Sequence, residues 1–137
     1  MKKLRLILFI SLFISSCQND EITRAKLNDF SKLFTVSKDN VVEIVGNSEL
    51  NNIIEYLEHD ISVYTITYNT TYQGKQIIAS GMVAFPDTEE GMPMLNFNHG
   101  TTSLHSDAPT VDLLQYSFFS NAASAGYILV IPDYLGF

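Results

Sequence analysis

One stretch near the C-terminal end decides the fold of this chain. It opens with Met94-Leu95-Asn96-Phe97-Asn98-His99-Gly100-Thr101-Thr102, in which Met94–Asn98 predicts a strand that ends at a turn. Leu113–Ala123 then predicts a helix that ends at Gly126, because glycine readily adopts the left-handed conformation that closes helices. Tyr127–Ile131 is apolar throughout, as is typical of a parallel strand covered on both faces. Strand, helix and strand together indicate the beginning of a parallel, helix-covered sheet.

Two earlier segments predict an antiparallel hairpin. Val63–Tyr72 and Gln76–Phe85 are rich in β-branched and aromatic residues, and Gln73-Gly74-Lys75 supplies a turn between them. Gly81 lies inside the second strand, where a glycine indicates a bulge or a bend. The predicted fold class is therefore α/β, with an antiparallel hairpin joined to the start of a parallel sheet.

Before the hairpin, the sequence predicts one helix and leaves one segment open. Ser48 can cap a helix, and Glu49 suits its first turn. Apolar side chains then recur at helical spacing, at Leu50, Ile53, Ile54, Leu57 and Ile61. The segment Leu27–Val45 is ambiguous. Gln18–Lys26 is polar and shows no hydrophobic period, as expected of a flexible tether.

The first residues of the chain predict an export signal. Lys2, Lys3 and Arg5 precede the uncharged apolar run Leu6–Ile14, which is too short to span a bilayer as a helix of about 20 residues. The run closes on Ile14-Ser15-Ser16-Cys17, which resembles a bacterial lipobox. This resemblance implies that Cys17 is lipidated, becomes the first mature residue and anchors the protein to a membrane. Ordinary signal cleavage, with Cys17 as a bystander, is the alternative.

Composition narrows the classes of function. Cys17 is the only cysteine, so the chain can form no internal disulfide, although an export route would permit one. The net charge of −7 becomes −10 without residues 1–16, which carry three positive and no negative charges. So acidic a chain is a poor ligand for nucleic acid, because phosphate contacts need Lys and Arg. A length of 137 residues allows at most one small domain.

Two motifs follow the two predicted parallel strands. His99-Gly100-Thr101-Thr102 follows the first, and Asp133-Tyr134-Leu135-Gly136 follows the second. Together with the hairpin, they resemble the N-terminal part of an α/β hydrolase over residues 60–137, and most of all secretory lipases and related esterases. The chain thus divides into a signal peptide over residues 1–16, a tether and uncertain segment over 17–47, and, as the resemblance implies, an incomplete α/β-hydrolase domain over 48–137. It also implies that the strand ending near Ile131 lies between the hairpin and Met94–Asn98.

The resemblance implies a role for each motif residue. In this fold the loop after the first strand lends backbone N–H groups to the negative charge that develops on the substrate carbonyl oxygen. Thr101 is the expected donor, and Gly100 lets the substrate approach the backbone because it has no side chain. The expected support of the loop comes from His99, Asp133 and Tyr134. The nucleophile, the acid and the histidine base of this fold are expected further along the chain.

Other patterns carry less weight. Ala122-Ala123-Ser124-Ala125-Gly126 matches the Gly-x-Ser-x-Gly nucleophile elbow in part, but the elbow needs a strand before its serine and a helix after it. The predicted order around Ser124 is the reverse. Ser80 lies within a predicted strand and is no better as a nucleophile. A metal site is the remaining possibility, although its members match no closed zinc spacing: His99, His105, Asp107 and Asp112.

The sequence therefore predicts the N-terminal part of an exported, membrane-anchored serine ester hydrolase, on the periplasmic face or the cell surface. It would act on an ester or lipid-like small molecule through an acyl-enzyme, with no cofactor, and the chain by itself is expected to be inactive. One alternative is a short non-catalytic surface lipoprotein that acts as a binding or scaffolding module. Another is a peptidase on the same fold. An elbow motif encoded downstream of Phe137 would distinguish the hydrolase from the binding module.

Overall fold

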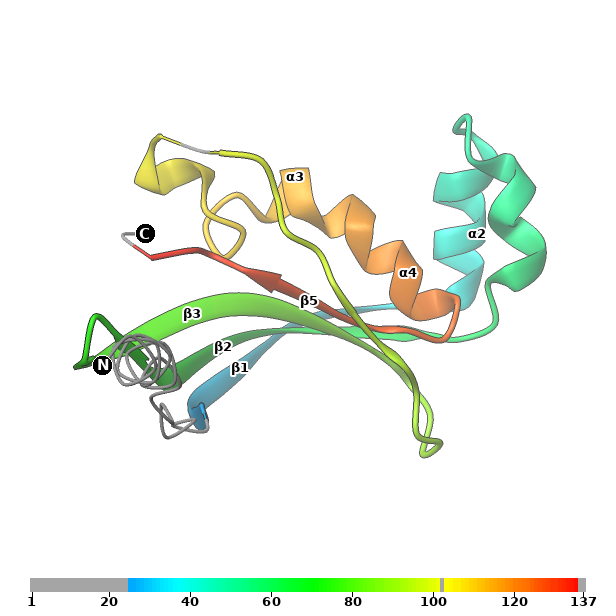
Figure 1. The fold of residues 1–137 in the computed structure, drawn as a ribbon. Coiled ribbons are helices and arrows are strands. Elements are labelled where there is room, and N and C mark those ends of the chain that lie inside the picture. Colours follow the sequence, from blue (N-terminus) through cyan, green and yellow to red (C-terminus); the bar gives the residue numbers. More distant parts are fainter. Residues whose placement is uncertain (1–24, 102, 136–137) are drawn as a thin grey trace, which may run out of the picture.

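A five-stranded mixed sheet organises the computed structural model, which describes residues 25–101 and 103–135 (Figure 1). The strand order is β1-β2-β3-β5-β4, and all neighbours are antiparallel except β4 and β5. The α/β class is confirmed, as is the position of β5 between the hairpin and β4. The strands are β1 (Lys26–Val36), β2 (Ile61–Tyr72), β3 (Lys75–Pro86), β4 (Met94–Asn96) and β5 (Ile128–Pro132).

The predicted hairpin is confirmed as β2 and β3. Tyr72 pairs with Lys75, so the turn between the strands has two residues. Gln73 has φ 49° and Gly74 has φ 74°, which places both in the left-handed region. A two-residue turn of this kind matches the right-handed twist of the flanking strands.

Of the bulge or bend expected at Gly81, the bulge is wrong. The pairing of β2 with β3 runs without a register shift through Ile66 and Gly81. Instead, a Cβ on Gly81 would lie 2.8 Å from the carbonyl oxygen of Ile131 in β5. The glycine is needed because the backbones of β3 and β5 approach closely at this point.

The segment that the sequence left open contributes both to the sheet and to the core. β1 pairs with β2, with register shifts between Leu27 and Asp29 and between Lys32 and Phe34. Such irregularities interrupt the alternation of inward and outward side chains, so a period of two is hard to recognise in the sequence. Helix α2 (Lys38–Gly46) follows, capped by Ser37, and it buries two valines. Cys17 and most of the expected tether lie outside the described residues.

The prediction of a single helix that begins at Ser48 is wrong. Ser48 Oγ donates to the carbonyl oxygen of Val45, at 2.7 Å, and accepts from the N–H of Leu50, at 3.1 Å, so Ser48 closes α2. The following residues form the 3₁₀ helix η1 (Asn51–Tyr56), and Ile61 already begins β2. The apolar period reflects core packing, because Leu57 is buried and Ile53 and Ile54 pack beside it.

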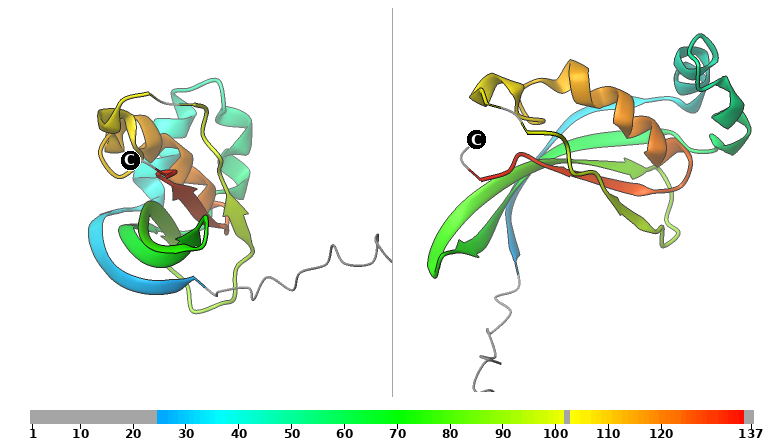
Figure 2. Two further views of the ribbon diagram at one scale, coloured as in Figure 1. Left: turned by 60° about the vertical axis from the view of Figure 1, so that its left-hand side comes forward. Right: turned by 45° about the horizontal axis from the view of Figure 1, so that its top comes forward.

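The core lies between the sheet and a layer of short helices on one face (Figure 2). The helix predicted over Leu113–Ala123 consists of α3 (Leu113–Ser117), η3 (Phe118–Ser120) and α4 (Asn121–Ser124), and it ends at Gly126, with φ 85° as expected. The 3₁₀ turn η2 (His105–Asp107) precedes it. The buried core residues are Val41, Val45, Leu57, Ile61, Val63, Met82, Ala84, Tyr116, Ala123, Leu129 and Ile131.

Candidate active site

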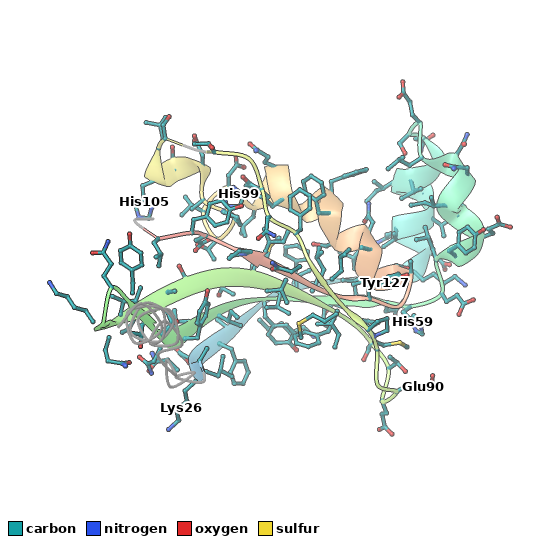
Figure 3. The ribbon with its side chains drawn as sticks, viewed as in Figure 1. Lys26, His59, Glu90, His99, His105 and Tyr127 are labelled. Atoms are coloured by element: carbon teal, nitrogen blue, oxygen red, sulfur yellow. The ribbon has the colours of Figure 1, made fainter. Side chains whose placement is uncertain are left out.

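The candidate site lies where β4 and β5 end. These strands are parallel, so their carboxyl ends meet at the same edge of the sheet, where ligands of α/β proteins usually bind. His99 follows β4, and Asp133 and Tyr134 follow β5. Figure 3 shows His99 between the loop after β4 and the end of β5, whereas His59 and Tyr127 lie at the opposite end of β5. The fold thus brings together the two motifs that the sequence singled out.

His99 holds the loop after β4 against the end of β5. Its side chain is buried, with 6% of its surface exposed. Nε2 lies 3.0 Å from the carbonyl oxygen of Pro132, and Nδ1 lies 2.8 Å from that of Gly100. A neutral imidazole donates one of these bonds, and an imidazolium donates both. Because both ring nitrogens face backbone carbonyls, this geometry suits a residue that supports the loop.

The contact with Gly100 also orients the N–H of Thr101. In a trans peptide the C=O and the following N–H point in opposite directions. Since the Gly100 oxygen points towards the His99 ring, the Thr101 N–H points away from it. Among the described residues, no group accepts a hydrogen bond from this N–H, and Thr101 is exposed. A Cβ on Gly100 would have no described atom within 4 Å. Within the described part of the chain, nothing competes with an external acceptor for this N–H.

Tyr134 supports the same loop from a strained backbone position. Its φ of 65° lies in the left-handed region, which costs a residue with a side chain about 1–2 kcal/mol. Its hydroxyl donates to the carbonyl oxygen of His99 at 2.6 Å, and its ring stacks on the imidazole with centroids 4.0 Å apart. Strain of this kind concentrates at functional sites, where surrounding contacts hold it in place.

Asp133 joins three segments of the chain through its carboxylate. Only 1% of this residue is exposed. Ser80 Oγ and Thr110 Oγ1 each donate to Oδ2 at 2.5 Å, and the N–H of Thr110 donates to Oδ1 at 2.9 Å. Sequence reasoning missed Ser80 and Thr110 as support residues, because they lie 53 and 23 positions from Asp133 and form no local pattern.

Tyr116 forms a buried wall beside His99. Its ring meets the imidazole edge-on, with centroids 5.5 Å apart. Burial raises the pKa of the Tyr116 phenol above its ordinary value, and the nearby carboxylates of Asp112 and Asp107 raise it further. The phenol therefore stays protonated and uncharged at neutral pH. Nothing in the local sequence marked this residue.

The remaining candidates from the sequence lie in other settings. Ser124 is fully buried, and its Oγ donates to the carbonyl oxygen of His59 at 2.7 Å, near the start of β5. This contact ties α4 to the segment before β2. His105 and Asp107 lie in η2. Within the described part of the chain, no group of three or more His, Cys, Asp or Glu side chains could hold a metal ion.

Comparison with known proteins links this fold to a hydrolase. No protein-family model and no curated protein matches the chain. A solved structure from Legionella pneumophila subsp. pneumophila str. Philadelphia 1, provisionally assigned as a hydrolase, matches with a TM-score of 0.69 and 29% sequence identity. The match covers 82% of this chain and 31% of the Legionella protein, so the chain spans less than a third of that protein's length. The likeness indicates a hydrolase-like fold.

Proposed function

We propose that the chain is the N-terminal part of an exported, membrane-anchored serine ester hydrolase of the lipase or esterase type. One observation carries this proposal. Thr101 is exposed, and its N–H is unpaired among the described residues and is oriented by the contact of His99 with Gly100, beyond the carboxyl end of a parallel strand. The likeness to the Legionella protein supports the hydrolase class.

In the proposed reaction, the N–H of Thr101 stabilises the oxyanion. Attack of a serine on an ester carbonyl creates a tetrahedral oxyanion, and a backbone N–H already aimed at that oxygen need not reorganise. One such donor contributes about 3–4 kcal/mol to transition-state stabilisation. His99, Tyr134 and Asp133 are positioning residues in this scheme, because they act on the backbone of the loop. The nucleophile, the acid and the base belong to the proposed whole protein and not to the described residues.

The test uses a hybrid in which residues 25–135 replace the matching segment of the Legionella protein. We expect the Legionella protein and the hybrid to hydrolyse nitrophenyl esters, and the chain alone to show no turnover above background. An inactive hybrid beside an active parent would count against the proposal. Hydrolysis of peptide substrates but not of esters would favour the peptidase. Turnover by the chain alone that disappears in Ser124→Ala would identify Ser124 as a nucleophile.

The proposed anchor is tested separately. None of the helices in the described part of the chain has the length and apolar character of a membrane-spanning helix. Cys17→Ser is expected to release the protein from membranes, because it removes the thiol that would carry the acyl chains. Labelling of cells with a radioactive fatty acid, followed by detergent phase partitioning, measures this. Ser16→Ala, which keeps a small residue before the cut site, is the control. A wild type that is unlabelled and soluble would contradict the anchor.

Asp133→Ala is expected to destabilise the hybrid by about 3 kcal/mol, because it leaves the hydroxyls of Ser80 and Thr110 and one buried N–H without their acceptor. Denaturant unfolding measures the free energy of unfolding. Asp87→Ala removes an exposed carboxylate and should change that free energy by less than about 0.5 kcal/mol. Equal effects of the two substitutions would show that the Asp133 contacts contribute little.

A further inference from the structure

A second candidate site lies away from the loop after β4. A cavity of about 310 Å³ opens between β1, α2 and the α3–η3 segment. Six apolar side chains line it, among them Phe34, Ile44 and Phe118, together with Ser120 and Asn121. Its volume lies at the lower end of the range of about 300–1,000 Å³ that is usual for small-molecule sites. No residue from His99 to Thr101 lines it, so it is distinct from the candidate active site.

One buried hydroxyl at this cavity is unpaired. Ser120 is 3% exposed, and its Oγ has no hydrogen-bond partner among the described residues. An unpaired buried hydroxyl costs about 1–3 kcal/mol, so a group that accepts its hydrogen bond would recover part of this cost. Ser120 lines the cavity while its Oγ is enclosed, so the hydroxyl would have to turn to another of its three staggered rotamers to meet an acceptor in the cavity.

The lining restricts the chemistry of a ligand. None of the described lining residues is charged, so an anionic head group would be desolvated without a partner. The apolar side chains favour a hydrocarbon body, and Ser120 offers one hydrogen bond. Phe118 and Ile44, which are 41% and 54% exposed, form an apolar rim through which a chain can enter.

We propose that this cavity binds the acyl chain of an uncharged lipid ester, with Ser120 Oγ donating to the ester carbonyl oxygen. We choose a lipid over another uncharged amphiphile because of the proposed anchor at Cys17. Acylation there would keep the domain at a membrane surface, next to lipids. Binding here needs no nucleophile, so it does not depend on hydrolysis at the loop after β4.

The test is photo-cross-linking of the full chain in washed membranes. The probe is a monoacylglycerol that carries a diazirine in its acyl chain, and mass spectrometry maps the labelled peptides. We expect labelling of the segments that contain Ile44 and Phe118, and its suppression by excess unlabelled monolauroylglycerol. Ser120→Ala should weaken the labelling about two- to tenfold, as expected for loss of one hydrogen bond.

A matched pair of substitutions separates the cavity from the general surface. Ile44→Asp places a charge on the rim and should abolish the labelling, because a charged group opposes entry of an acyl chain. Ile78→Asp changes an isoleucine that is 66% exposed on β3 and does not line the cavity, so labelling should persist. Limited proteolysis confirms that each variant keeps its fold.

Several outcomes would overturn the proposal. Labelling that excess lipid cannot compete, or that is equal in the Ile44 and Ile78 variants, would show mere partition of the probe into membranes. Labelling confined to the open face of the sheet around Phe30 would place the lipid elsewhere. These results are independent of ester hydrolysis by the hybrid and of fatty-acid labelling at Cys17, so each proposal can fail by itself.

Discussion

Replacing Thr101 by proline is expected to lower the kcat of the hybrid by about 10²–10³-fold, the usual cost of removing one oxyanion donor. Proline has no backbone N–H, so the substitution removes the proposed donor. The N–H is placed for this role because the Gly100 carbonyl is turned towards Nδ1 of His99, at 2.8 Å. The donor acts on charge that develops in the transition state, so KM should change far less than kcat.

Thr101→Val provides the matched control. It removes the side-chain hydroxyl and keeps the backbone N–H, so we expect kcat to stay within a few-fold of the parent value. Steady-state kinetics on a nitrophenyl ester measure both variants, and thermal unfolding verifies that the proline variant folds. If the folded Thr101→Pro variant keeps full activity, Thr101 is not the donor. If Thr101→Val loses as much as Thr101→Pro, the hydroxyl carries the effect.

The parts of the fold that sequence reasoning predicted are those set by local chemistry. Gln73 and Gly74 turn the chain because both adopt positive φ, and Gly126 ends α4 for the same reason. The strand β5 was recognisable from its apolar run, but the expected cover on both faces is wrong, because buried and half-buried residues alternate along β5 and the helices lie on one face of the sheet (Figure 2). Each of these signals lies within a few residues of the feature that it predicts.

Tertiary contacts decided the parts that sequence reasoning missed. β1 was ambiguous because register shifts interrupt its alternation, and its strand character comes from pairing with β2. Ser48 has the residue type of a helix N-cap, but in the fold it closes α2 through Val45. In both cases the local pattern was compatible with more than one structure.

In the candidate site too, local sequence predicted some features and tertiary contacts decided the others. The motif residues could be located because they follow predicted strands directly. Their support could not, since Asp133 receives its hydrogen bonds from Ser80 and Thr110, which are distant in the sequence. The positive φ of Tyr134 is equally invisible in the sequence, because tyrosine rarely adopts it.

We expect residues 18–137, expressed alone in aqueous solution, to aggregate or to remain partly molten. β4 pairs only with β5 among the described strands, so its outer edge is open, with Met94 70% and Leu95 44% exposed. The sheet face opposite the core also exposes apolar side chains: Phe30 is 62% exposed and packs against Tyr64, whose neighbour Val63 in β2 points into the core. An open apolar edge is a template for pairing with another chain. Net stability of about 0.05–0.15 kcal/mol per residue leaves little to offset such missing cover.

Dye binding and a thermal melt test this expectation. The protein should bind a hydrophobic dye and lack a sharp transition, whereas the hybrid should melt cooperatively. Leu95→Lys should reduce aggregation, because a charged side chain on an edge strand opposes further pairing. Leu104→Lys changes an exposed leucine in a loop and should leave aggregation unchanged. A soluble wild-type monomer with a cooperative melt would contradict the prediction. It would also favour the short binding module over the hydrolase, because the domain would then fold without further cover.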